Sequence, residues 1–274
     1  MYRARSLYAQ KFFMLERSLT YTKWVLMKNQ NENLSWDRQS LLAKIPGRYK
    51  RCDNVTSFCY LAFDIIALVV INLLYMSFPV SNPIANTIVT VVHIYLSGLF
   101  LAALSVLAHE CGHGAFCKPR WLELSIGFIL QSCLLWPFTG WREYHRLHHR
   151  YNKNIALDTH WVKHDKQAPQ GKLYQFLVYN KICYLILGFI GFLGFTWVNL
   201  GGIGSQYRSQ PFYRYNQFSP KNPIFKDKEH LIRLDLLAFF AVLIISICCC
   251  IKFSFTTVFV TYYGPILVVH FLFV

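Results

Sequence analysis

The chain has 274 residues, of which 54% are hydrophobic and 17% aromatic, and its formal net charge is +15. Long uncharged runs and this apolar fraction exclude an ordinary soluble domain. The positive charge does not indicate nucleic-acid binding, because the basic residues lie between hydrophobic runs. Loops of a membrane protein that face the cytosol carry an excess of Lys and Arg, and this explains the basic residues better.

Residues 1–57 are predicted to form a basic, cytosolic N-terminal region. They hold eleven Lys and Arg residues and no uninterrupted apolar stretch, so a cleavable signal peptide is not expected. The first 28 residues are either a solvated tail, a helix at the membrane surface or an organelle transit segment. The first apolar run would then itself direct insertion into the membrane.

Four apolar runs approach the roughly 20 residues that cross a hydrocarbon layer about 30 Å thick: 58–79, 84–107, 234–251 and 255–274. The connection 80–86 has no Lys or Arg, which places it outside and both neighbouring basic segments in the cytosol. Two further runs, 121–139 and 182–201, are predicted to be re-entrant or interfacial, because a crossing there would separate the histidines or export basic segments. The expected fold is an all-α integral membrane protein with about four transmembrane helices and a cytosolic histidine-rich region.

Five of the ten histidines form two clusters, "HECGH" at 109–113 and "HRLHH" at 145–149. Helical positions three and four apart share a face, so His109 and His113 are predicted to point at one centre, and His145 with His148 and His149 repeats this geometry. Imidazole suits iron, copper, zinc and nickel, so the pattern predicts a metal site without naming the metal. The first cluster also matches the H-E-x-x-H pattern of zinc proteases, but the second supplies more ligands than a three-ligand zinc site needs.

Several other polar residues occur near or inside the apolar runs. Glu110, between the two histidines of the first cluster, is predicted either to orient a neighbouring imidazole or to face cytosolic water. Asp64 is costly inside the first run and is expected to bond to another span or to contact substrate. His93 and His270 are expected in contacts between helices.

Structural roles are predicted for the aromatic, histidine and cysteine residues outside these clusters. Trp136, Trp141 and Trp161 are expected in the aromatic belt at the membrane surface. His160 and His164 are expected in a solvated loop, with an extra ligand role as the alternative. The nine cysteines include no CxxC pair, so no disulfide framework is predicted.

Three segments resemble the membrane fatty acid desaturases, especially the acyl-lipid omega-6/omega-3 group: "LLAKIPGRYKRC" before the first span, "AHECGHGAF" at 108–116 and "WREYHRLHH" at 141–149. The resemblance covers roughly residues 34–274. It implies a di-iron centre held by three histidine boxes, of which His109 and His113 match the first and His145, His148 and His149 the second. It also implies that cytochrome b5 or ferredoxin reduces the irons and that dioxygen is used to remove two hydrogens from a membrane acyl lipid.

The third box of that family, HxxHH, does not occur before Val274, where the chain ends inside an apolar run. On the family pattern, residues 58–274 would be a desaturase-like domain that is incomplete at its C-terminus, with five of the usual eight ligands. The expectation is a fragment or truncated form of a desaturase of the endoplasmic reticulum, or of a plastid or other organelle membrane. An acyl hydroxylase on the same scaffold and a non-catalytic, desaturase-derived membrane protein are the alternatives, so the sequence leaves open whether this chain is an enzyme.

Overall fold

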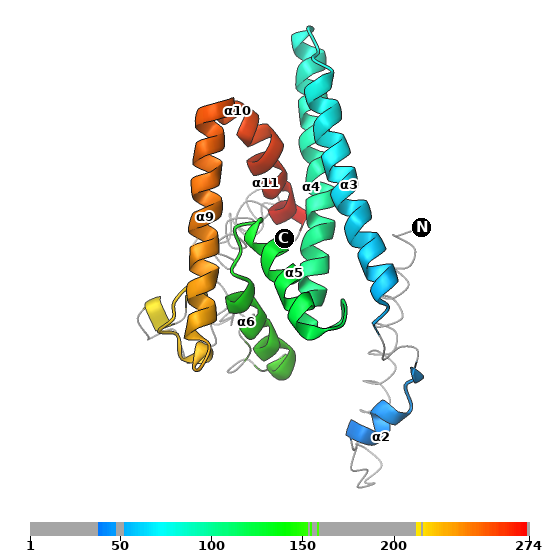
Figure 1. The fold of residues 1–274 in the computed structure, drawn as a ribbon, viewed down its shortest axis with the longest axis vertical. Helices are drawn as coiled ribbons and strands as arrows, with labels where there is room; N and C mark the ends of the chain where they lie inside the picture. The colour runs from blue at the N-terminus through cyan, green and yellow to red at the C-terminus, as the bar shows by residue number, and fades with distance from the viewer. Residues whose placement is uncertain are drawn as a thin grey trace, which may run out of the picture. The chain divides into compact units, whose positions relative to one another are not determined.

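The computed structural model describes residues 38–47, 52–152, 154, 158, 212–214 and 216–272. The chain divides into two units, Met1–Arg51 and Cys52–Val274, and the described residues of the first form the short helix α2 (Arg38–Ala43). The described residues are helical or irregular and contain no strand, which confirms the predicted all-α fold (Figure 1).

The first two spans form a long antiparallel hairpin of α3 (Asn54–Ser77) and α4 (Pro83–His113) (Figure 1). Both helices begin at a polar cap: the Asp53 and Asn82 side chains each accept hydrogen bonds from two backbone N–H groups of the first turn. At 1.5 Å per residue, 24 and 31 residues give lengths of about 36 and 46 Å, more than the hydrocarbon layer requires. Helix α4 therefore continues past the predicted run 84–107 and carries the first histidine cluster in its last two turns.

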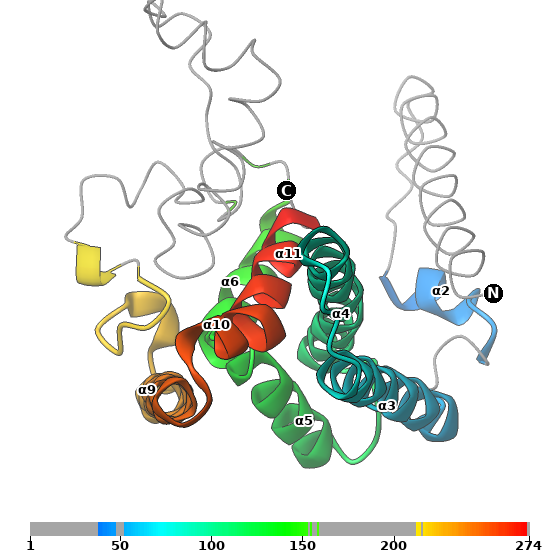
Figure 2. The same ribbon diagram turned by 90° about the horizontal axis from the view of Figure 1, so that it is seen from above.

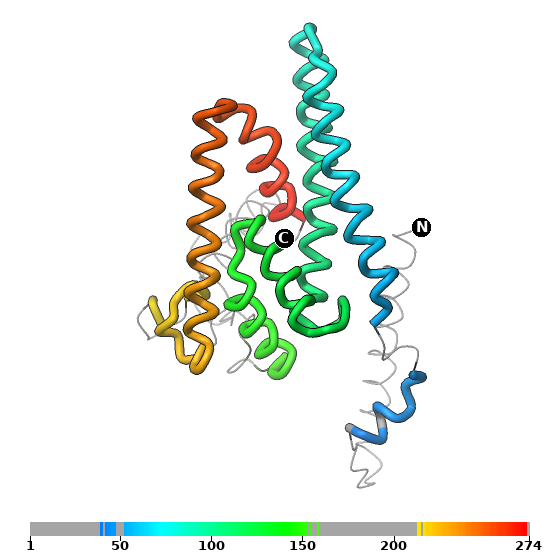
Figure 3. Tube along the Cα trace, in the orientation of Figure 1, coloured from blue at the N-terminus to red at the C-terminus, as the bar shows by residue number. Residues whose placement is uncertain are grey.

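The other two spans are α9 (Glu229–Phe253) and a segment made of α10 (Phe255–Val258), the π-helical turn η5 (Phe259–Tyr263) and α11 (Gly264–Leu272) (Figure 3). Four helices of the described chain are long and apolar enough to cross a membrane: Asn54–Ser77, Pro83–His113, Glu229–Phe253 and Phe255–Leu272. They correspond to the four predicted spans. The last one differs from a regular α-helix because η5 interrupts it.

Helix α11 packs along α4 (Figure 2). Gly98 permits this close approach, because a Cβ at that position would lie 2.6 Å from Cγ1 of Val268. Beside this contact, Trp136 Nε1 donates a hydrogen bond to His270 Nε2 at 3.1 Å, and His270 Nδ1 donates to the Ile266 carbonyl at 2.8 Å. His270 is thus a helix-packing residue, as predicted.

Two buried polar residues lie in the α3–α4 hairpin. His93 is 4% exposed and stacks on Tyr75 with ring centroids 4.2 Å apart, but neither of its ring nitrogens has a hydrogen-bond partner among the described residues, so the polar contact predicted between spans is replaced by ring stacking. Asp64 is also buried, and its Oδ2 has no hydrogen-bond partner among the described residues. The hydrogen bond between spans predicted for Asp64 is therefore not formed by this oxygen within the described chain.

The predicted re-entrant run 121–139 forms α5 (Arg120–Ser132) and the beginning of α6 (Phe138–Tyr151). Thirteen residues give α5 a length of about 20 Å, too short to cross the hydrocarbon layer, as predicted. Two 3₁₀ turns, η3 (Phe212–Arg214) and η4 (Pro223–Phe225), precede α9. The predicted run 182–201, together with His160, His164 and Trp161, lies outside the described residues.

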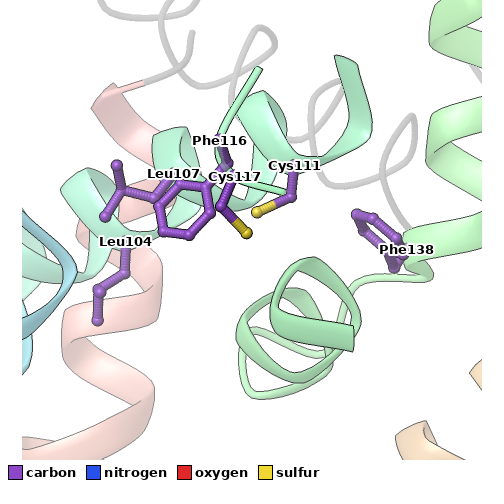
Figure 4. Close-up of a cluster of buried hydrophobic side chains, with 6 residues drawn as sticks. All are labelled: Leu104, Leu107, Cys111, Phe116, Cys117 and Phe138. Carbon is purple, nitrogen blue, oxygen red and sulfur yellow. The ribbon is translucent and has the colours of Figure 1, made fainter. Parts of the chain in front are cut away.

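A buried apolar cluster lies between the C-terminal part of α4, the connection to α5 and the start of α6: Leu104, Leu107, Cys111, Phe116, Cys117 and Phe138 (Figure 4). Gly127 of α5 fits between α4 and α6, because a Cβ there would lie 2.5 Å from the Phe138 ring and 2.8 Å from Cβ of Cys111. The eight described cysteines are free, in agreement with the predicted lack of a disulfide framework.

Candidate metal centre

The two histidine clusters meet where α4 ends and α6 runs beside it. Nε2 of His113 lies 2.9 Å from Nε2 of His109 and 3.2 Å from Nε2 of His145. Nε2 of His149 lies 2.9 Å from Nε2 of His145. One donor nitrogen from each of His109, His113 and His145 lies within 4.8 Å of the other two. The structure thus brings four of the five predicted histidines together.

The spacing of these nitrogens fits ligands of one metal ion. Imidazole nitrogens bind first-row metals at about 2.0–2.1 Å, so two ligands at right angles on one ion are about 3 Å apart. The separations of 2.9 and 3.2 Å around His113 match that value. An all-imidazole group suits several transition metals, iron included, so the donor set fits iron without selecting it.

His148 has a different environment from the other four histidines. Its Nδ1 lies 2.8 Å from Oδ1 of Asp158, whose side chain is 1% exposed. A carboxylate that accepts from one ring nitrogen fixes the tautomer and makes the other nitrogen a better metal donor. Asp158 was missed by the sequence reasoning, although it is one of only five acidic residues between positions 108 and 173.

Trp141 forms a wall of the histidine cluster. Its ring stacks on His145 with centroids 4.7 Å apart and an interplanar angle of 18°, and it lies 4.9 Å from the His109 ring. Gly112 provides the space, because a Cβ there would lie 2.8 Å from the indole. The predicted place in an interfacial belt is therefore wrong for Trp141 and also for Trp136, since both are buried in the protein.

The end of α4 is held by an arginine from α5. Gly114 closes the helix in the left-handed conformation (φ 83°), and Arg120 donates hydrogen bonds to the carbonyls of Cys111 and Gly112 at 2.9 and 3.3 Å. The buried Glu123 carboxylate pairs with Arg120. The Arg120 guanidinium satisfies carbonyls that have no partner within the helix, and its positive charge interacts favourably with the negative end of the helix dipole.

Glu110 was predicted to contact an imidazole. In the part of the chain that the structure describes, no hydrogen bond joins its carboxylate to a histidine. Its role as an orienting acceptor stays a prediction. At this end of α4 the carboxylate with defined partners is Glu123, which also accepts from the backbone N–H of Phe116 at 2.7 Å.

Helix α6, which carries the second cluster, is held by α9 and the segment before it. Oδ2 of Asp235 accepts hydrogen bonds from the backbone N–H groups of Thr139 and Gly140 at 2.9 and 3.0 Å. Asn222 donates to the hydroxyl of the buried Tyr144 at 2.9 Å. The first N–H groups of a helix have no internal partner, and a negative charge there is favourable. Asp235 was not named in the sequence analysis. It lies inside the predicted span 234–251, where an ionisable side chain indicates a functional or structural role, and this was the signal that could have identified it.

A charged cluster surrounds Glu143, one turn into α6. Its carboxylate contacts Arg142 at 3.0 Å, Arg146 at 3.2 Å and Lys228 at 2.6 Å. Burial opposes ionisation of Glu143, but the hydrogen bond from Lys228 and the charge of Arg142 outweigh it, so its pKa lies below the usual value. Glu143 is therefore an ionised, buried anchor for three cations.

The comparison with protein families supplies the identity of this arrangement. The model of the fatty acid desaturase family matches residues 86–274, a stretch that includes both histidine clusters. The chain belongs to the fatty acid desaturase family. This confirms the relationship predicted from the two histidine boxes, and the histidine cluster of this desaturase-family chain is compatible with a metal site.

Curated relatives agree with the family assignment. A fatty acid conjugase of Calendula officinalis is 26% identical over 190 residues, which cover 66% of this chain and 49% of the relative. A Delta(12) fatty acid dehydrogenase of Crepis alpina is 36% identical over 149 residues, which cover 52% and 37%. An omega-6 fatty acid desaturase, endoplasmic reticulum isozyme 1, of Glycine max is 26% identical over 185 residues, which cover 65% and 45%. The chain therefore spans less than half the length of these desaturase-family relatives.

Proposed function

We propose that this protein acts as a membrane fatty acyl desaturase of the omega-6/omega-3 type, which uses dioxygen to introduce a double bond into an acyl-lipid chain. The observation that carries the proposal is the convergence of three imidazole nitrogens, from His109, His113 and His145, within 4.8 Å at the end of a membrane-spanning helix. Family membership and the Delta(12) and omega-6 names of the relatives support the acyl substrate.

We infer that the metal is iron, held by His109, His113 and His145, with His148 and His149 as the further ligands from this chain. An unactivated methylene offers no acidic proton or electrophilic centre to ordinary side chains, so a bound redox metal supplies the chemistry. The role proposed for Glu110 is to accept a hydrogen bond from one of the ligating imidazoles.

The residues around the histidines hold and orient them. The Trp141 ring restricts the rotation of the His145 imidazole by stacking on it. Asp158 accepts a hydrogen bond from Nδ1–H of His148, which leaves Nε2 with the lone pair that a metal needs. Arg120 and Asp235 fix the ends of α4 and α6 that bring the two clusters together. Such support reduces the reorganisation that metal binding requires.

The remaining parts of the proposal concern location and partners. Residues 1–57 are the proposed cytosolic region and 58–274 the membrane domain, with the histidines facing the cytosol. The proposed location is the endoplasmic reticulum, which is supported by the name of the Glycine max relative. Cytochrome b5 or ferredoxin is the proposed electron donor, and the substrate is a membrane acyl lipid.

Metal binding tests the site directly. The purified full chain should bind iron, or cobalt(II) as a spectroscopic substitute, with absorption bands typical of imidazole coordination. His113→Ala should abolish these bands, whereas His230→Ala, which removes an exposed histidine of α9, should leave them unchanged. Equal spectra for wild type and His113→Ala would contradict the assignment.

Activity is tested separately by expressing in yeast a version of the protein that carries the third HxxHH box of the family, and by analysing the fatty acids of the yeast lipids. New double bonds are expected, and they should disappear with His148→Ala or His149→Ala but persist with His230→Ala. A chain that binds metal at the histidines but produces no new double bond would favour the non-catalytic alternative.

A further inference from the structure

A cavity of about 570 Å³ lies between the end of α4, helices α5 and α6 and the residue before α9, and His113 of the histidine cluster forms part of its lining. Its volume falls within the range of about 300–1,000 Å³ that is usual for ligand pockets. Four cations line it, Arg120, Arg142, Arg146 and Lys228, and no acidic side chain is among the lining residues. Such a lining is suited to an anion.

The positive charge of this cavity is only partly neutralised. Glu123 pairs with Arg120, and the single carboxylate of Glu143 is shared by the other three cations. The Asp235 carboxylate also interacts with the charge of Arg142, so three carboxylates face four cations and one positive charge is left over. Four cations held around one cavity repel each other, so a bound anion would stabilise this end of the protein.

Arg146 has donors to spare for such an anion. It contacts Glu143 through one terminal nitrogen at 3.2 Å, and its side chain is 59% exposed. A guanidinium carries five N–H donors in a planar fork that matches the oxygens of a phosphate. Arg142 and Lys228, by contrast, are held closer to Glu143, at 3.0 and 2.6 Å.

The location of the cavity indicates which phosphate it meets. Gly114 follows the last residue of one membrane-spanning helix, and Lys228 precedes the first residue of another. Both line the cavity, which therefore opens at the level where spans end and lipid headgroups begin. Basic pockets between the ends of transmembrane helices bind anionic lipid headgroups for this reason.

We propose that this cavity binds the phosphate of an anionic phospholipid and so attaches the histidine-bearing helix α6 to the membrane surface. A zwitterionic headgroup fits less well, because its ammonium group would meet four cations and no lining carboxylate. The bound lipid is a structural ligand, separate from the acyl substrate. Its binding does not depend on metal or on desaturase activity.

Native mass spectrometry of the purified full chain in detergent tests the proposal. Dioctanoylphosphatidic acid, dioctanoylphosphatidylcholine and inorganic phosphate are the probes. Phosphatidic acid should bind most tightly, and Arg146→Gln should weaken it about tenfold, the usual loss for a charge-assisted hydrogen bond. Arg150→Gln removes the same charge one turn further along α6, outside the cavity lining, and should change binding less than twofold.

Three results would overturn the proposal. Equal affinity for phosphatidylcholine and phosphatidic acid would show that the charge excess does not select the headgroup. Inorganic phosphate that binds as tightly as the lipid would assign the cavity to a free ion. Equal losses in Arg146→Gln and Arg150→Gln would indicate attraction by the whole surface. The comparison of the three probes on the unaltered chain stands even if Arg146→Gln fails to fold.

Discussion

Oδ2 of Asp235 accepts a hydrogen bond from the backbone N–H of Gly140 at 3.0 Å, although 95 residues separate them. The same oxygen accepts from Thr139, so one buried carboxylate satisfies two N–H groups at the start of α6. A membrane span thereby controls the position of the helix that presents His145 and His149. The second histidine cluster depends on α9 even though α9 contributes no histidine to it.

Replacing Asp235 by alanine should loosen α6. Two buried N–H groups would lose their acceptor, which costs about 1–3 kcal/mol for each unsatisfied group. Asp235→Asn keeps one acceptor oxygen and should lose less. Apparent melting temperature in detergent and cobalt(II) binding should both fall in the order wild type, Asp235→Asn, Asp235→Ala. Identical cobalt(II) affinity in all three would show that this bond does not position the histidines.

Asp158→Asn should weaken metal binding about 10- to 100-fold, the usual effect of removing a carboxylate that orients a ligating imidazole. The expected cause is loss of the fixed tautomer of His148, whose Nδ1 faces Asp158. Asp227→Asn is the matched control, because Asp227 is exposed and no hydrogen bond joins its carboxylate to a histidine among the described residues. Metal affinity measured by competition with a chelator checks the prediction, and unchanged affinity in Asp158→Asn would contradict it.

Gly112→Ala should disturb the metal centre without touching a histidine. The added Cβ would lie 2.8 Å from the Trp141 ring, which must move and so release the His145 imidazole stacked on it. Cobalt(II) spectra should broaden or shift. Gly47→Ala is the control, since a Cβ at Gly47 would meet nothing within 4 Å. If Gly112→Ala and Gly47→Ala give the same spectrum, the stacking contact is not needed for coordination.

Gly98→Ala should destabilise the packing of α11 on α4 by about 1–3 kcal/mol, the usual cost of overpacking. The new methyl would lie 2.6 Å from Cγ1 of Val268. Val268→Ala should restore only part of the loss in the double variant, because it removes Cγ1 but keeps Cβ, which also lies against the new methyl. Melting temperatures of the wild type, the two single variants and the double variant give the coupling energy between positions 98 and 268. If the two single effects simply add in the double variant, the strain does not arise from the contact between these residues.

Features that depend on local patterns could be predicted from the sequence. The four spans follow from apolar length, and the pairing of His109 with His113 follows from helical spacing. The prediction that 121–139 does not cross was derived from the need for the two clusters to share a site, and α5 in that run is too short to span. These features need only the period of a helix and the thickness of a membrane.

Contacts between distant residues could not be predicted in the same way. Asp235 and Gly140 share no local pattern, and nothing in the letters around Asp158 shows that it would face His148. Trp141 was assigned to the membrane surface because the aromatic-belt rule gives the depth of a residue but not the direction of its side chain. Gly112 leaves room for the Trp141 ring to point toward the histidines. This effect of a missing side chain can be recognised only once the packing of α4 against α6 is known.

The length of α4 has a consequence for the path of a substrate. His109 lies 26 residues after Pro83, about 39 Å along the helix, which exceeds the hydrocarbon thickness of about 30 Å. On the proposed desaturase function, the histidines stand outside the hydrocarbon layer, and an acyl tail has to leave that layer to reach them. Each methylene exposed to water would cost about 0.8 kcal/mol, so the proposal requires an apolar route through the protein to the centre.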